Sequence, residues 1–287
     1  MQRWKIGNVS ITRIIETEDT SMTAEIMLPD AQPEAVLQIP WLRPHFIDAD
    51  GNLISSIFSL LVESCGKKIV VDTCLGNDKP RAVPAWNDRQ GAFLDEIAAA
   101  GFPRESVDVV VCTHLHPDHV GWNTMWRDGE WQPTFPNARY LFSEKDWEWL
   151  DQAPVTPLGD YCGDSVRPLF AAGLADVVQP DHSITDEVRL MSTPGHSPGH
   201  VAVRISSHGE HAVVTGDLIH HPCQMAYPGW CSTFDFDQRA ALQTRADFLA
   251  GFSGEPVLVI GTHFATPTAG HIVADGDVYR FNTDVSD

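Results

Sequence analysis

A short run of the sequence, THLHPDH, places four side chains of metal-binding type within six residues: His114, His116, Asp118 and His119. Three more such residues each follow an apolar stretch typical of a β-strand: His196 in TPGHSPGH, Asp217 in TGD and His263 in GTH. Imidazole nitrogens and carboxylate oxygens are common ligands of divalent transition metals. Together the seven residues can supply a complete ligand set for two metal ions.

The spacing within THLHPDH indicates how these ligands divide between two ions. His114 and His116 are two residues apart just past a predicted strand, so their side chains point the same way and can reach one ion. Asp118 and His119 follow a proline turn and point elsewhere, which suits a second ion nearby. Two cations about 3.5–4 Å apart repel each other, so they need a shared anionic ligand. We expect Asp217 to be this bridge, because a carboxylate has two oxygens.

The apolar pattern predicts the elements that position these residues. We expect strands over residues 9–15, 57–63, 69–72, 107–112, 140–142, 187–192, 200–205, 212–215 and 257–260. We expect helices over residues 88–100, 143–150, 165–172 and 238–252, with mixed structure across the rest of 153–180. This order favours an α+β protein of two similar halves, each a sheet covered by helices, with the histidine-bearing loops at one edge.

One long segment, residues 17–52, carries four prolines and has no strong periodicity. A loop of this length in a compact domain is usually functional. We expect it to cover a pocket, to act as an arm in a homodimer, or simply to pack on its own core. No composition change marks a linker, so residues 1–287 are expected to form a single domain.

The composition limits the partners of the chain. Its formal net charge is −20, from 39 acidic and 19 basic residues. Such a surface repels nucleic acid backbones and anionic membranes, so we expect neither as a partner. The first residues lack a signal-peptide pattern and no run is long enough to span a membrane, so a cytoplasmic location is expected.

The motifs together resemble those of the metallo-β-lactamase-fold superfamily, over residues from about 57 to 263. The resemblance implies a four-layer αββα sandwich with the metal site at the edge between the two β-sheets. It implies a first ion held by His114, His116 and His196, a second ion held by Asp118, His119 and His263, and a bridge at Asp217. It also implies that Asp72, in IVVDT, lies behind the ligands and orients a metal histidine.

Details favour one branch of the superfamily. True β-lactamases commonly lack the bridging aspartate, which this chain has. Ribonuclease Z-like members act on nucleic acid, which the net charge of −20 argues against. The C-terminal region has no basic patch suited to the glutathione of glyoxalase II. What remains resembles the lactonase and methyl parathion hydrolase-like branch. One position departs from it: acyl-homoserine lactonases typically carry a tyrosine three residues after the bridging aspartate, and this chain has His220.

The predicted chemistry is hydrolysis by two divalent metal ions. Zinc fits a ligand set without cysteine, and manganese, cobalt or iron are also compatible. Two ions would turn water into a bridging hydroxide that attacks the substrate. Asp118 or His220 would then protonate the leaving alkoxide.

We expect an apolar lactone of the acyl-homoserine type, or a related ester, as the small-molecule substrate. The expected pocket residues are apolar or aromatic and follow the metal motifs: Trp122, Met225, Tyr227, Trp230 and Phe264. The alternatives are a phosphotriesterase or aryl esterase, a β-lactamase, a mononuclear iron dioxygenase and a binding module without catalysis.

Overall fold

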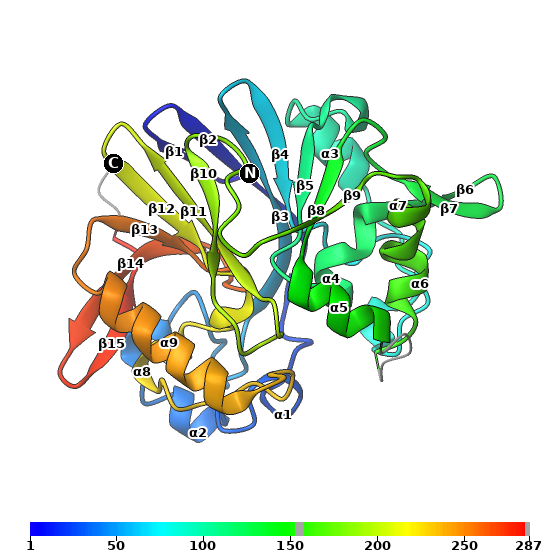
Figure 1. The fold of residues 1–287 in the computed structure, drawn as a ribbon. Helices are drawn as coiled ribbons and strands as arrows, with labels where there is room; N and C mark the ends of the chain where they lie inside the picture. The colour runs from blue at the N-terminus through cyan, green and yellow to red at the C-terminus, as the bar shows by residue number, and fades with distance from the viewer. Residues whose placement is uncertain (153–157, 285–287) are drawn as a thin grey trace.

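Two mixed β-sheets dominate the computed structural model, which describes residues 1–152 and 158–284 (Figure 1). In spatial order, the first sheet contains β1 (Arg3–Ile6), β2 (Val9–Asp19), β3 (Ser55–Ser64), β4 (Lys67–Val71), β5 (Val109–Val111), β8 (Arg139–Ser143) and β9 (Ala175–Val178). The second sheet contains β10 (Val188–Ser192), β11 (Val201–Ser207), β12 (Glu210–Val214), β13 (Val257–Ile260), β14 (Ala269–Asp275) and β15 (Val278–Asn282). A small hairpin joins β6 (Thr124–Arg127) to β7 (Glu130–Pro133).

Helices flank the two sheets and also lie along the edge where the sheets meet (Figure 1). They are α1 (Ala24–Met27), α2 (Pro33–Val36), α3 (Phe93–Ala99), α4 (Pro117–Val120), α5 (Glu144–Gln152), α6 (Tyr161–Ser165), α7 (Arg167–Ala171), α8 (Cys223–Ala226) and α9 (Gln238–Phe252). Single 3-10 turns lie at Pro40–Leu42, Pro84–Trp86, Arg104–Ser106, Gly121–Asn123 and Gly216–Leu218. Helix α5 flanks the first sheet and α9 flanks the second (Figure 1). The predicted αββα arrangement is therefore confirmed.

The central strands are buried on both faces because alternate side chains belong to two different cores. In β4, Ile69 and Val71 belong to the apolar cluster between the two sheets. Val70, which lies between them in the sequence, belongs to the outer cluster under the helices. In β12, Val214 likewise belongs to the cluster between the sheets and Val213 to the outer cluster. This period of two explains why these strands appear as unbroken apolar runs in the sequence.

Parallel pairing brings the functional loops to one edge. Strands β4 and β5 run parallel in the first sheet, and β12 and β13 run parallel in the second. The carboxyl ends of parallel strands meet at the same edge of a sheet, so the segments that follow these strands are neighbours in space. The segments after β5, β12 and β13 carry predicted ligands, and the segment after β4 carries Asp72.

The segment 17–52 packs on the core of its own chain. Its first residues extend β2 to Asp19, beyond the predicted end of that strand at residue 15, and α1 and α2 follow. Leu28, Val36, Leu42 and Phe46 are at most 1% exposed and anchor the segment. Two of its residues, Met22 and Met27, line a recess beside the predicted ligands, as expected. The homodimer stays a prediction.

Several elements differ from the sequence prediction. Helix α3 begins at Phe93 rather than at residue 88, because Asp88 has a φ of 48°, which no α-helix accommodates. The helix predicted over 165–172 is the shorter α7, and α6, which ends just before it at Ser165, was not predicted. Strands β1, β9, β14 and β15 and the β6–β7 hairpin were missed, and residues 153–157 of the predicted mixed region lie outside the described residues. No helix in the described ranges could cross a membrane.

Candidate metal centre

The seven predicted ligands lie together at the edge shared by the two sheets. His114 follows β5 and His116 precedes α4, whose first turn contains Asp118 and His119. Pro117 occupies the first helical position, which its fixed φ favours. The other three ligands follow strands of the second sheet: His196 after β10, Asp217 after β12 and His263 after β13. The first sheet therefore supplies four ligands and the second sheet three.

Three imidazoles and a carboxylate make one half of the cluster. Nδ1 of His116 faces Nε2 of His196 at 2.9 Å. Oδ2 of Asp217 lies 3.5 Å from Nε2 of His196 and 3.8 Å from Nε2 of His114. Ligands bound tetrahedrally at about 2.0–2.2 Å from one zinc ion are about 3.3–3.6 Å apart. The spacing of these atoms therefore suits one shared ion.

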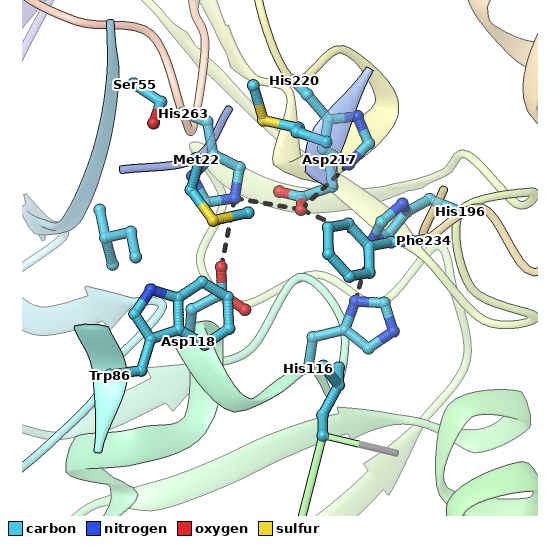
Figure 2. Close-up of a pocket in the computed structure, with 13 residues that line it drawn as sticks. Met22, Ser55, Trp86, His116, Asp118, His196, Asp217, His220, Phe234 and His263 are labelled. Atoms are coloured by element: carbon cyan, nitrogen blue, oxygen red, sulfur yellow. Dashed lines mark hydrogen bonds and ion pairs between the residues drawn. The ribbon is translucent and has the colours of Figure 1, made fainter. Parts of the chain in front are cut away.

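The other half of the cluster contains two carboxylates, those of Asp118 and Asp217, and two imidazoles. Oδ2 of Asp118 lies 3.6 Å from Nε2 of His119 and 3.5 Å from Nε2 of His263. Oδ1 of Asp217 lies 3.4 Å from Nε2 of His119, and its Oδ2 lies 3.1 Å from Nε2 of His263. Asp217 thus contacts both halves, as a bridging ligand must. Figure 2 shows His116, Asp118, His196, Asp217 and His263 converging on one recess.

Hydrogen bonds behind the ligands set the direction of their rings. Asp72 accepts from Nδ1 of His119 at 3.0 Å, and from the backbone N–H and hydroxyl of Thr113 at 2.7 Å and 2.9 Å. Nδ1 of His263 donates to the carbonyl of Ser56 at 2.9 Å. In each neutral ring, Nε2 then presents its lone pair to the cluster. The position of Asp72 agrees with its predicted orienting role.

Asp235 makes an equivalent contact that the sequence reasoning missed. Its carboxylate accepts from Nδ1 of His196 at 3.0 Å, and its side chain is fully buried. Arg245, also fully buried, places a guanidinium nitrogen 3.7 Å from the same carboxylate. No motif or spacing connects Asp235 with His196, which lies 39 residues earlier, so the sequence alone carries no signal for this pair.

Burial and charge adjust the protonation of the cluster. Burial is the main cause that lowers the pKa of His114 and of His116 well below the usual value, so both rings are neutral. Burial opposes charge on His119 as well, but Asp217, Asp118 and Asp72 together raise its pKa well above the usual value. Without metal, protons therefore occupy part of the cluster, and metal uptake should release them.

Unpaired polar atoms show that the residues fit a metal site. In the described ranges, Nε2 of His114, Nε2 of His119 and Oδ1 of Asp217 are buried without a hydrogen-bond partner. Leaving such groups unpaired costs about 1–3 kcal/mol each, and more for charged groups. All three atoms point into the cluster, where two cations that share Asp217 would satisfy them. Their donor types, nitrogen and oxygen without sulfur, suit zinc and related ions.

A mostly apolar recess opens beside the cluster, with about 410 Å³ of empty space that includes open solvent. Asp118 and His220 both line it. Its other walls come from well-separated segments of the chain and include Met22, Met27, Ile57, Trp86, Leu158 and Phe234. Two of these residues belong to the segment 17–52, which therefore covers the recess (Figure 2).

The five residues expected to line the pocket lie elsewhere: Trp122, Met225, Tyr227, Trp230 and Phe264. The indole of Trp122 stacks on Phe93 with ring centroids 5.5 Å apart and donates to Glu16 at 2.7 Å. Tyr227 and Trp230 stack on each other at 4.3 Å, away from the cluster.

Core packing accounts for the other two expected pocket residues. Met225 and Phe264 are completely buried. Phe264 packs edge-on against Phe46 and Phe281, with centroids 6.3 Å and 5.1 Å away. Proximity in sequence to a metal motif was therefore a poor guide to the pocket, because it does not determine the direction of a side chain.

Two packed β-sheets flanked by helices, with histidine and aspartate side chains clustered at the edge between the sheets, are typical of one class of metal-binding α+β proteins. The chain belongs to the metallo-beta-lactamase superfamily, whose sequence model matches residues 54–263. The predicted resemblance is therefore confirmed at the level of the superfamily.

Curated relatives share part of this sequence. An N-acyl homoserine lactonase of Bacillus cereus is 23% identical over 173 residues, which cover 55% of this chain and 61% of the relative. The N-acyl homoserine lactonase AttM of Rhizobium radiobacter is 29% identical over 122 residues, 41% of this chain and 43% of the relative. The matched regions thus span less than two thirds of either relative.

Solved structures match almost the whole chain. AbOPH, a hydrolase of the beta lactamase superfamily, gives a TM-score of 0.79 at 25% identity, covering 99% of this chain and 98% of its own. AidC, a dizinc quorum-quenching lactonase in complex with a product, gives 0.78 at 19% identity, covering 100% and 98%. The second likeness shows the fold alone.

Proposed function

We propose that this protein is a dinuclear metal-dependent hydrolase that opens lactones of the acyl-homoserine type or cleaves related apolar esters. The observation that carries the proposal is the cluster of seven ligand side chains at one end of an apolar recess. The lactonase activity of the curated relatives supports the choice of lactones.

In this proposal, each half of the cluster holds one ion. His114, His116 and His196 hold the first, Asp118, His119 and His263 hold the second, and Asp217 is shared. Bound divalent ions supply a nucleophile by lowering the pKa of water towards neutrality, and they act as Lewis acids on a substrate oxygen. Zinc is the proposed metal, with manganese, cobalt or iron as alternatives.

The residues of the chain itself orient the ligands and handle a proton. Asp72 and Asp235 hold two of the histidine rings by their Nδ1 atoms. Asp118 borders both the cluster and the recess and is 8% exposed, so its carboxylate can meet a departing alkoxide. We assign it a proton transfer: it would take the proton that the attacking water gives up and pass it to the leaving group. The second residue proposed for this step, His220, is considered below.

The recess favours an uncharged, apolar substrate. In the part of the chain that the structure describes, no lysine or arginine lines it. A substrate with a carboxylate or phosphate diester beside its scissile bond would therefore find no cationic partner among these walls. An acyl chain, by contrast, would contact methionine, leucine and aromatic side chains.

The first test is metal content together with a substrate panel. We expect about two ions per chain, and faster hydrolysis of a long-chain homoserine lactone than of an aryl ester, paraoxon or a cephalosporin. Preference for one of the last three would reassign the substrate class to an aryl esterase, a phosphotriesterase or a β-lactamase. One iron per chain with oxygen uptake would instead identify a dioxygenase.

A pair of variants tests whether the cluster performs the reaction. His116→Ala should lower kcat/KM by about 100-fold or more, because loss of even an outer partner costs about 10–100-fold. His45→Ala is the control, since this histidine is exposed and outside the cluster. Full activity in the His116 variant would refute the catalytic assignment.

A further inference from the structure

His220 is a buried histidine with no evident purpose in the fold. The residue is 2% exposed, and neither ring nitrogen has a hydrogen-bond partner within the described ranges. The buried rings of His119, His196 and His263 each use Nδ1 in a hydrogen bond. An unpaired imidazole is costly to bury, so its position calls for a partner that the described residues do not supply.

The ring of His220 faces the first half of the metal cluster. Its Nε2 lies 3.5 Å from Oδ2 of Asp217, which equals the distance from Nε2 of His196 to that oxygen. The ligand atoms of His196, Asp217 and His220 all lie within 4.8 Å of one another. The ring centroid of His220 is 4.7 Å from that of His196 but 6.1 Å from that of His263.

The surrounding loop holds the ring in this place. The backbone N–H of His220 donates to Oε1 of Gln224 at 2.7 Å, and Gln224 in turn donates to the carbonyl of Trp230. The next residue, His221, is tied to the carbonyl of Phe46 through Nε2 at 2.8 Å. The backbone of His220 and the side chain of His221 are thus fixed, while the ring of His220 has no hydrogen-bond partner among the described residues.

We propose that His220 is a ligand of the first metal ion through Nε2, an addition to the seven residues named above. This inference rests on the proposed dinuclear centre. It replaces the role first considered for His220, that of protonating the leaving alkoxide.

This ligand makes the two ions chemically unequal. The first ion has four imidazoles and a share of Asp217, whereas the second has two imidazoles, one carboxylate of its own and the same share. Imidazole suits zinc, and carboxylate suits harder ions such as manganese. The first position should therefore hold zinc tightly, and the second should exchange its ion more readily.

The test is a zinc titration of the metal-free protein in competition with a chromophoric chelator. The wild type should bind two ions. In His220→Gln, which keeps an N–H donor but is a poor ligand, one ion should bind at least about 10-fold more weakly. His182→Gln is the matched control: the same change at an exposed histidine outside the cluster should leave both affinities unchanged.

The outcomes separate this inference from the proposed function. A wild type that binds fewer than two ions would remove the dinuclear centre itself. A wild type with two ions and a His220→Gln variant with the same two affinities would overturn the ligand assignment and leave the hydrolase intact.

A second measurement needs no variant and covers the case in which His220→Gln fails to fold. In the zinc-loaded wild type labelled with ¹⁵N-histidine, Nε2 of His220 should show the chemical shift of a metal-bound nitrogen. A shift typical of a free imidazole would overturn the assignment.

Discussion

The contact between Asp235 and His196 allows a quantitative prediction about metal affinity. Asp235 is buried, yet its pKa is lowered: burial opposes this, but the hydrogen bond from His196 and the nearby charges outweigh it. The carboxylate is therefore ionised at neutral pH and accepts a charge-assisted hydrogen bond. Asp235→Asn keeps the shape and one acceptor oxygen but removes the charge.

The size of the effect follows from the strength of that hydrogen bond. Bonds to charged groups contribute about 1.5–3 kcal/mol, roughly twice the value of neutral ones. Losing the charge should therefore cost about 1–1.5 kcal/mol in binding of the first ion, which is about 10-fold in affinity. This agrees with the range of about 10–100-fold for partners behind metal ligands.

The assay is again chelator competition, now with Asp237→Asn as the control. Asp237 lies two residues along the same loop and caps α9 by accepting from the N–H of Ala240 at 3.0 Å, a role that asparagine performs equally well. The Asp235 variant should still fold, because Arg245 keeps its contacts with the carbonyls of Leu218, Pro228 and Trp230. Equal zinc affinities in both variants and the wild type would refute the reasoning.

Two further predictions concern stability. Gly121→Ala would place a Cβ 1.9 Å from the carbonyl oxygen of Leu75, so it should lower the free energy of unfolding in urea by about 3 kcal/mol or more. Gly229→Ala is the control and should be nearly neutral, because a Cβ there meets open space. Similar stability of the two variants would contradict this. Burial lowers the pKa of Lys79 from 10.5 to about 7, with Asp164 opposing the shift. Between these pH values the unfolded state binds more protons than the folded state. The stability of the wild type relative to Lys79→Met should therefore increase as the pH rises from about 7 to about 10. A stability difference that stays constant across this range would show that Lys79 remains charged in the fold.

The positions of some elements and of the metal cluster were predictable because the signals are local. Helix α9 has the predicted bounds, since Asp237 provides a cap and the apolar residues repeat with helical period. Strand β13 also matches, as an apolar run between two turns. The ligands His114 and His116 were identifiable from their spacing alone, because an extended segment directs alternate side chains the same way.

The recess and the outer contacts were not predictable because they depend on long-range packing. Met22, Trp86 and Phe234 line the recess from three distant parts of the chain, and no local pattern connects them. Trp122 follows the metal motif directly, yet its ring turns towards Phe93. Loop side chains take their direction from whichever neighbour the tertiary fold supplies, so the prediction failed where tertiary packing decides.

The division of the ligands between the two sheets has a mechanical consequence. His114 to His119 belong to the first half of the chain, and His196, Asp217 and His263 belong to the second. Ions bound by both groups of ligands would cross-link the two halves of the chain at the edge where the two sheets meet. Neither half alone could assemble a dinuclear site, so two separately produced fragments should capture both ions only once they have reassociated.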